Sequence, residues 1–153
     1  MRFVTIKSIE QQDILSIHRV RERLVKNRTA LANEIRGLLT EFGLIIPQGI
    51  NKVGEKLIEV LNSGKLSGIS YQTFSALKEE LIDNNTKIKE LEKRLIEIAK
   101  QYETYKQLIG IPGIGLITAT ALIASIGNAS CFKNGRQLST WVWSGTEATF
   151  QWR

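Results

Sequence analysis

The chain of 153 residues has little of the chemistry that catalytic or disulfide-bonded proteins carry, with one cysteine, one histidine and two prolines. A single cysteine excludes a disulfide framework and fits a reducing compartment. The histidine, His18, has no Cys, Asp or Glu at ligand spacing, so we interpret it as a surface residue. No nucleophile stands next to a base in the sequence. The sequence therefore predicts no catalytic residue, no metal and no cofactor in this chain.

Long apolar segments are also missing. Residues 1–8 contain no apolar core of signal-peptide length. The uncharged stretch 108–132 has the length of a membrane span, but Gly110, Pro112 and the glycines after them would break a helix near its start. The remaining apolar segment, 116–126, is too short to span a bilayer. We therefore expect a cytoplasmic protein with no membrane partner.

Positive charge is in excess, with 21 Lys and Arg against 15 Asp and Glu and a formal charge of +6. This balance favours an anionic partner such as nucleic acid. A run of basic residues lies in the first predicted helix, and from it we predict Arg19, Arg23 and Lys26 as nucleic-acid contacts. The alternative is an ordinary solvated helix surface, which is common for charged helices. The sequence leaves both interpretations open.

Two long segments carry apolar residues at heptad spacing, which is typical of coiled-coil helices. The first segment runs from Ser8 to Phe42, with a predicted capping box from Ser8 to Gln11 and Gly43 as the terminating residue. Two arginines, Arg21 and Arg28, interrupt its seam. The second segment has two sets of seam positions, Phe74, Leu81, Ile88, Leu95 and Tyr102 with Leu77, Asn84, Leu91, Ile98 and Tyr105.

The heptads lead to a prediction of an all-α fold. We assign residues 1–107 to a coiled-coil region whose linker, 43–70, holds a short helix over 53–61, and residues 108–143 to a small helix-hairpin-helix segment. The two long helices form either an antiparallel hairpin or half of a dimeric stalk. The sequence does not choose between these arrangements.

The string from Leu108 to Ala119 predicts a helix, a tight glycine turn and a second helix. Glycines allow positive φ and close approach of another backbone. The free amides at the start of the second helix would then face a phosphate. Such contacts read the sugar–phosphate backbone and not the bases. The alternative is a helix–helix corner that binds nothing. The candidate contacts here are Pro112, Gly113, Ile114, Gly115 and Leu116, with Lys133 and Arg136 flanking a later turn.

Several strings resemble the middle of the insertion-sequence-one-ten family of transposases. They lie at 8–12, 15–19, 28–33 and 36–39, at Ile111-Pro112-Gly113-Ile114-Gly115, and at 132–139. The resemblance covers nearly the whole chain up to Trp141. It implies a DNA recombinase with an N-terminal acidic metal-binding domain, a coiled-coil region and a C-terminal serine nucleophile, and some members are guided by a structured RNA.

The resemblance also implies that this chain is a fragment. The acidic domain has no counterpart here, and the residues from Met1 correspond to a region already entering the coiled coil. After Leu138 the family continues with a string such as GLVPRQHSSGG. Codons that can encode residues 143–153 can also encode this string when they are read one base later. We therefore expect a frameshift near 141–143 and an out-of-frame, disordered tail over 144–153. Sequencing the encoding DNA tests this hypothesis.

Two functions follow as expectations. The first is a transposase fragment that binds DNA, with structured RNA as a second candidate, and self-associates through its coiled coil without catalysis. The second is a structural coiled-coil module with no nucleic-acid role.

Overall fold

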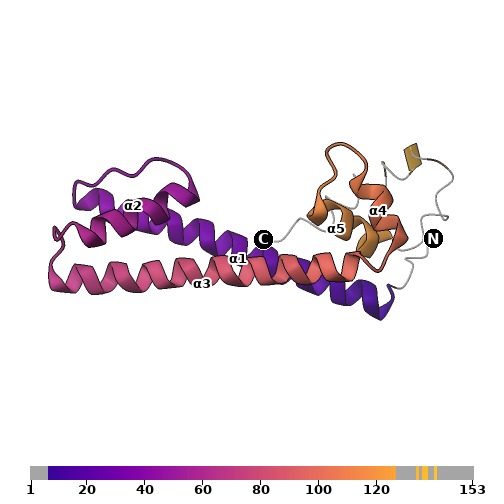
Figure 1. Cartoon of the computed structure of the whole chain (residues 1–153), viewed down its shortest axis with the longest axis horizontal. Coiled ribbons are helices and arrows are strands. Elements are labelled where there is room, and N and C mark those ends of the chain that lie inside the picture. The colour runs from indigo at the N-terminus through magenta and orange to yellow at the C-terminus, as the bar shows by residue number, and fades with distance from the viewer. Residues whose placement is uncertain (1–6, 127–133, 135, 138–139, 141–153) are drawn as a thin grey trace.

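The computed structural model describes residues 7–126, together with 134, 136, 137 and 140. Within the described residues there are five helices and no strand, which confirms the predicted all-α class. The helices are α1 (Ile9–Glu41), α2 (Ile50–Asn62), α3 (Gly68–Ala99), α4 (Glu103–Ile109) and α5 (Leu116–Ile126). Figure 1 shows α1 and α3 side by side along the long axis, with α2 at one end and α4 and α5 at the other. We call the α1–α3 pair the stalk.

The ends of α1 follow from local chemistry that the sequence displays. The Ser8 side chain accepts a hydrogen bond from the Gln11 amide at 3.2 Å, and the Gln11 side chain accepts one from the Ser8 amide at 2.9 Å. This is the predicted capping box. Gly43 follows the C-cap residue Phe42 with φ +73°, a conformation that favours glycine, so the predicted terminating residue is also confirmed.

The second long helix differs from its predicted extent at both ends. It begins at Gly68, inside the predicted linker, where the Ser67 side chain accepts a hydrogen bond from the Ser70 amide. It ends at Ala99, before the last predicted seam positions, Tyr102 and Tyr105. Tyr102 instead adopts an extended backbone, with φ −102° and ψ 121°, and precedes the separate helix α4. The heptad pattern continues past the end of α3, because residues that pack the corner between α3 and α4 also have to be apolar.

The stalk is an antiparallel hairpin within one chain, one of the two arrangements that the heptads left open. Arg21 pairs with Glu92 and Arg28 bonds to Asn85, so residue numbers rise on α1 as they fall on α3. Five seam positions of α3 are buried, namely Phe74, Leu81, Asn84, Ile88 and Leu95. Because the seam is filled by the chain's own helices, the heptads do not require a second copy.

Two apolar clusters hold the ends of the stalk. At the distal end, where α1 ends and α3 begins, α2 packs on both long helices through a cluster that includes the fully buried Leu57, Ile35 and Leu39. At the other end, Ala124 of α5 packs against Ile14 of α1 and Leu95 of α3. In the part of the chain that the structure describes, no helix is both long and apolar enough to cross a membrane.

Two glycines, one inside α1 and one just after it, give a matched test of this backbone. A methyl group added at Gly37 or Gly43 would meet no atom within 4 Å, but Gly37 lies inside the helix whereas Gly43 has φ +73°. We expect Gly37→Ala to raise the free energy of unfolding by about 0.5–1 kcal/mol, because alanine loses less backbone entropy in a helix. Gly43→Ala should lower it by about 1–2 kcal/mol, the cost of a left-handed conformation. Urea denaturation of both variants measures the change in the free energy of unfolding. Equal changes would contradict a helical backbone at Gly37 and a left-handed one at Gly43.

Candidate nucleic-acid interface

The glycine turn between α4 and α5 lies on the surface. Ile111, Pro112, Gly113 and Gly115 are all exposed. The turn closes with two backbone hydrogen bonds, from the Ile111 amide to the Leu108 carbonyl and from the Ile114 amide to the Ile111 carbonyl, each at 3.1 Å. Gly113 has φ +90°, so this position needs glycine. The predicted order of helix, turn and helix is therefore present, with an exposed loop at its centre.

Backbone amides at the start of α5 remain free for an external acceptor. The first helical bond runs from the Ala119 amide to the Gly115 carbonyl at 2.9 Å. Among the described residues, the amides of Leu116, Ile117 and Thr118 have no hydrogen-bond partner. The positive end of the helix dipole also lies there. Of these residues, Thr118 is exposed, while Leu116 and Ile117 are half-buried. The turn thus has the groups that an anion would need.

The predicted basic residues lie on the outer surface of α1. Arg19, Arg23 and Lys26 are all exposed, and their positions along the helix spread them around more than one side of it. The Lys26 ammonium pairs with Glu22 at 2.8 Å. Arg23 lines a groove between α1 and α3 that also holds the carboxylates of Glu80, Asp83 and Glu90.

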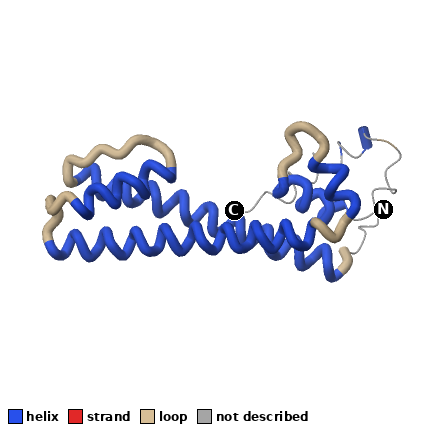
Figure 2. Tube along the Cα trace, in the orientation of Figure 1, coloured by secondary structure: helices blue, strands red, loops and turns tan. Residues whose placement is uncertain are grey.

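The structure brings the turn and the basic residues to the same level of the stalk, without placing them in contact. Thr120 contacts His18, and the later α5 residues Ile123 and Ile126 lie with Ser8 around a pocket at the start of α1. The helix α5 therefore runs antiparallel to α1. The turn that precedes it lies on the side of the α4–α5 pair that faces the middle of the stalk, and it stands away from the two long helices, as the loop in Figure 2 shows.

The predicted contacts after α5 are only partly described. Arg136 is exposed, and the Asn134 side chain accepts a hydrogen bond from the Gln137 amide at 2.9 Å beside it. Lys133 lies outside the described residues, as do the expected out-of-frame tail 144–153 and the residues from Met1 to 6. In the described part of the chain, no group of three His, Cys, Asp or Glu residues could hold a metal ion.

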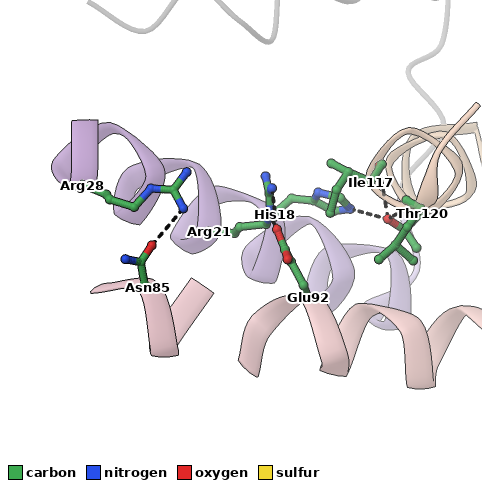
Figure 3. Close-up of polar contacts among 8 residues, drawn as sticks. His18, Arg21, Arg28, Asn85, Glu92, Ile117 and Thr120 are labelled. Carbon is green, nitrogen blue, oxygen red and sulfur yellow. Dashed lines mark hydrogen bonds and ion pairs between the residues drawn. The ribbon is translucent and has the colours of Figure 1, made fainter. Parts of the chain in front are cut away.

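His18 does not lie free on the surface, so the surface interpretation was wrong. Its Nε2 atom lies 3.0 Å from the Thr120 Oγ1 atom, and its side chain is half-buried under α5. The Thr120 hydroxyl donates to the Leu116 and Ile117 carbonyls, so it is left to accept from the imidazole N–H (Figure 3). The sequence could not reveal this contact, because the two residues are 102 positions apart.

The burial of His18 under α5 makes the docking of this helix sensitive to pH. Burial lowers the pKa of the His18 imidazole below its ordinary value of 6.5, and the nearby Arg21 guanidinium lowers it further. A depressed histidine pKa means that the fold favours the neutral form. The contribution of His18 to the free energy of unfolding is therefore complete above pH 6.5 and is lost as the pH falls through the folded-state pKa.

We expect acidification from about pH 7.5 to about pH 5.5 to reduce the stability of the wild-type chain more than that of His18→Gln, which cannot gain a proton. Urea denaturation at both pH values tests this. An equal loss in the two proteins would show that His18 does not carry the pH dependence.

Comparison with known proteins gives a consistent result. Residues 105–142, which include the glycine turn and Arg136, match the family described as Transposase IS116/IS110/IS902 family. The chain is 40% identical over 144 residues to the transposase for insertion sequence element IS1111A of Coxiella burnetii, covering 93% of this chain and 40% of that protein. It is 39% identical over 145 residues to a probable family 20 transposase of Pseudomonas aeruginosa, covering 93% and 43%.

A third relative is the transposase for insertion sequence element IS1328 of Yersinia enterocolitica, 32% identical over 136 residues, with 89% of this chain and 40% of that protein covered. No solved structure matches the chain. The chain spans about two fifths of the length of the curated relatives it matches. By sequence, the chain is therefore similar over most of its own length to curated transposases, and its residues 105–142 match the IS116/IS110/IS902 transposase family.

Proposed function

We propose that this chain is a part of an insertion-sequence transposase that binds the sugar–phosphate backbone of DNA through the Pro112–Leu116 turn and does not itself catalyse strand transfer. The observation that carries the proposal is the set of unpartnered amides at the start of α5, in an exposed turn within the segment that matches the transposase family. Amides at a helix N-terminus form a binding site for phosphate.

The charge of the chain supports an anionic polymer as the partner. Arg19, Lys26 and Arg136 supply exposed positive charge, and the chain as a whole carries +6. Contacts of this kind position a protein on DNA without reading its sequence. We therefore propose sequence-independent binding in the micromolar range or weaker, about 10⁻⁴–10⁻⁶ M at physiological salt.

A structural module without a nucleic-acid role is the alternative, and the relationship to transposases does not favour it. Self-association and binding to structured RNA stay predictions. Analytical ultracentrifugation measures the first directly, and an RNA arm of the binding experiment addresses the second.

The experiment is a gel shift with a short duplex DNA between about 50 and 200 mM salt, comparing the wild-type chain with Gly115→Val. A Cβ atom added at Gly115 would meet no atom within 4 Å and the φ of this residue is not positive, so the fold should tolerate the change. We expect Gly115→Val to weaken binding about five- to tenfold, because the side chain keeps phosphate from amides whose interaction is on the order of 1 kcal/mol.

The matched control is Gly68→Val. Gly68 is the first residue of α3, at the opposite end of the stalk, and a side chain there also meets open space. Its affinity should equal that of the wild-type chain. If the wild-type chain gives no shift at about 50 mM salt, or if Gly115→Val binds as tightly as Gly68→Val, the proposed contact at the turn is wrong.

A further inference from the structure

A row of polar contacts runs along one side of the stalk, between α1 and α3, starting at α5. His18 contacts Thr120, Arg21 Nε and Nη2 donate to Glu92 at 2.9 and 2.6 Å, and Arg28 Nη1 donates to Asn85 at 3.1 Å. Figure 3 shows these contacts in sequence from α5 along the stalk. We call this side of the stalk the α5 side. In Figure 1, α2 and α5 lie at its two ends, and none of the described helices covers the middle of the stalk.

Exposed lysines of α3 lie beside this row. Lys89 is four residues after Asn85 and three before Glu92, and these are the spacings that bring side chains together on a helix. Lys93 follows one turn later. Both lysines are exposed, and within the described residues neither forms an ion pair. Their charges are therefore available to an external anion.

The helix α1 adds a cation on the same side. Lys26 lies one turn after Glu22, its ion-pair partner, and Glu22 lies one turn after His18. Arg28 adds a buried Nε atom that has no hydrogen-bond partner in the described structure. The α5 side thus carries five cations, Arg21, Lys26, Arg28, Lys89 and Lys93, against three carboxylates, Glu22, Glu92 and Glu97, the last of which lies one turn after Lys93.

The opposite side of the stalk has no such excess among the residues that the structure describes. The groove between α1 and α3 on that side is lined by three cations and three carboxylates, Arg23, Lys87 and Arg94 with Glu80, Asp83 and Glu90. Lys87 already pairs with Asp83 at 2.6 Å. The same two helices are therefore positive on one side and balanced on the other. An interspersed, solvated helix surface would show no such difference between its sides.

We infer that the α5 side of the stalk is a docking surface for duplex DNA, which extends the contact at the Pro112–Leu116 turn along the middle of the stalk, where no described helix covers α1 and α3. The inference rests on the proposed function and adds Lys89 and Lys93 as phosphate contacts. It commits to the backbone of a duplex because the surface offers a row of cations and because the middle of the stalk, residues 18–28 and 81–95, contains no aromatic residue on which an unpaired base could stack. It also assigns Arg23 to the side that faces away from DNA.

The test compares two charge-matched double variants of the full chain. Lys89→Gln with Lys93→Gln removes two charges from the α5 side, and Lys87→Gln with Arg94→Gln removes two from the opposite side of the same helix. All four side chains are exposed, so both variants should fold, which circular dichroism and urea denaturation verify. Binding to a short duplex DNA is measured by fluorescence anisotropy between about 50 and 200 mM salt.

We expect the α5-side variant to flatten the slope of log K against log salt by about 2, because each phosphate that is no longer neutralised removes about 0.9 from the slope. The opposite-side variant should keep the wild-type slope. Equal effects in the two variants would show that only net charge matters, and would overturn the inference. So would an unchanged slope in the α5-side variant.

Two further results keep this inference distinct from the proposed function. If the wild-type chain binds DNA and Gly115→Val weakens that binding while the α5-side variant does not, the turn contact stands and the docking surface is wrong. A folded RNA hairpin is tested in parallel. If the α5-side variant loses affinity for the RNA and keeps it for DNA, the assignment of the surface to DNA is overturned.

Discussion

Replacing Leu95 with alanine is expected to lower the free energy of unfolding by about 2–5 kcal/mol, the usual cost of truncating a fully buried leucine. Leu95 has 0% of its surface exposed and lies where α1, α3 and α5 meet, against Ile14 and Ala124. Truncation leaves a cavity at a three-helix junction. Because each neighbour is held by a different helix, the site cannot collapse without moving one of them.

Ile82→Ala is the matched control on the same helix. Its side chain is 54% exposed, so truncation should change the free energy of unfolding by no more than about 0.5 kcal/mol. Urea denaturation of the two variants gives the comparison. A Leu95→Ala variant as stable as Ile82→Ala would mean that α5 does not pack on the stalk as described.

Replacing Ala124 with leucine should release α5 from the stalk. Ala124 is 0% exposed between Ile14 and Leu95, and the larger side chain has no space there. Overpacking of this kind costs about 1–3 kcal/mol. The destabilisation should be local, because α2 and the distal half of the stalk have their own apolar cluster.

Hydrogen exchange of individual backbone amides is the measurement. We expect amides of α5 to lose protection in Ala124→Leu while amides near Leu81 keep it. Glu79→Leu, at an exposed position of α3, controls for an added leucine and should leave both regions unchanged. Uniform loss of protection along the chain would contradict a separate α5 docking contact.

The long helices could be predicted from sequence because their signals are local. Ser8 and Gln11 mark the start of α1, and Gly43 marks its end, through hydrogen bonds and a backbone conformation within a few residues. The seam residues could be predicted from spacing alone. The end of α3 could not, because Tyr102 satisfies the heptad while packing at a corner where the backbone is extended.

Partners across the fold could not be predicted from sequence. A heptad fixes which residues are buried and not which helix buries them, so it fits a hairpin and a dimer equally well. The ion pair of Arg21 with Glu92 of the same chain distinguishes the two. The helix α5 is apolar on most of its surface, so its pattern does not show which side packs on α1. For the same reason His18 was interpreted as a surface residue.

The candidate site was predictable in part. The glycine turn follows from Gly113, whose positive φ only glycine adopts without strain. The basic residues of α1 could be identified as a group, but their orientation could not. The packing of α5 defines one side of the stalk. Lys26 and Lys89 lie on that side and Arg23 lies on the other, which the sequence does not show.

The contact between backbone amides and phosphate is tested most directly by following amide resonances of the ¹⁵N-labelled chain while a short duplex DNA is added. We predict that the amides of Leu116, Ile117 and Thr118 shift together and saturate with the same affinity as the gel shift. If the chain binds the duplex while these three resonances stay in place and others move, the turn at the start of α5 is not where the nucleic acid is held.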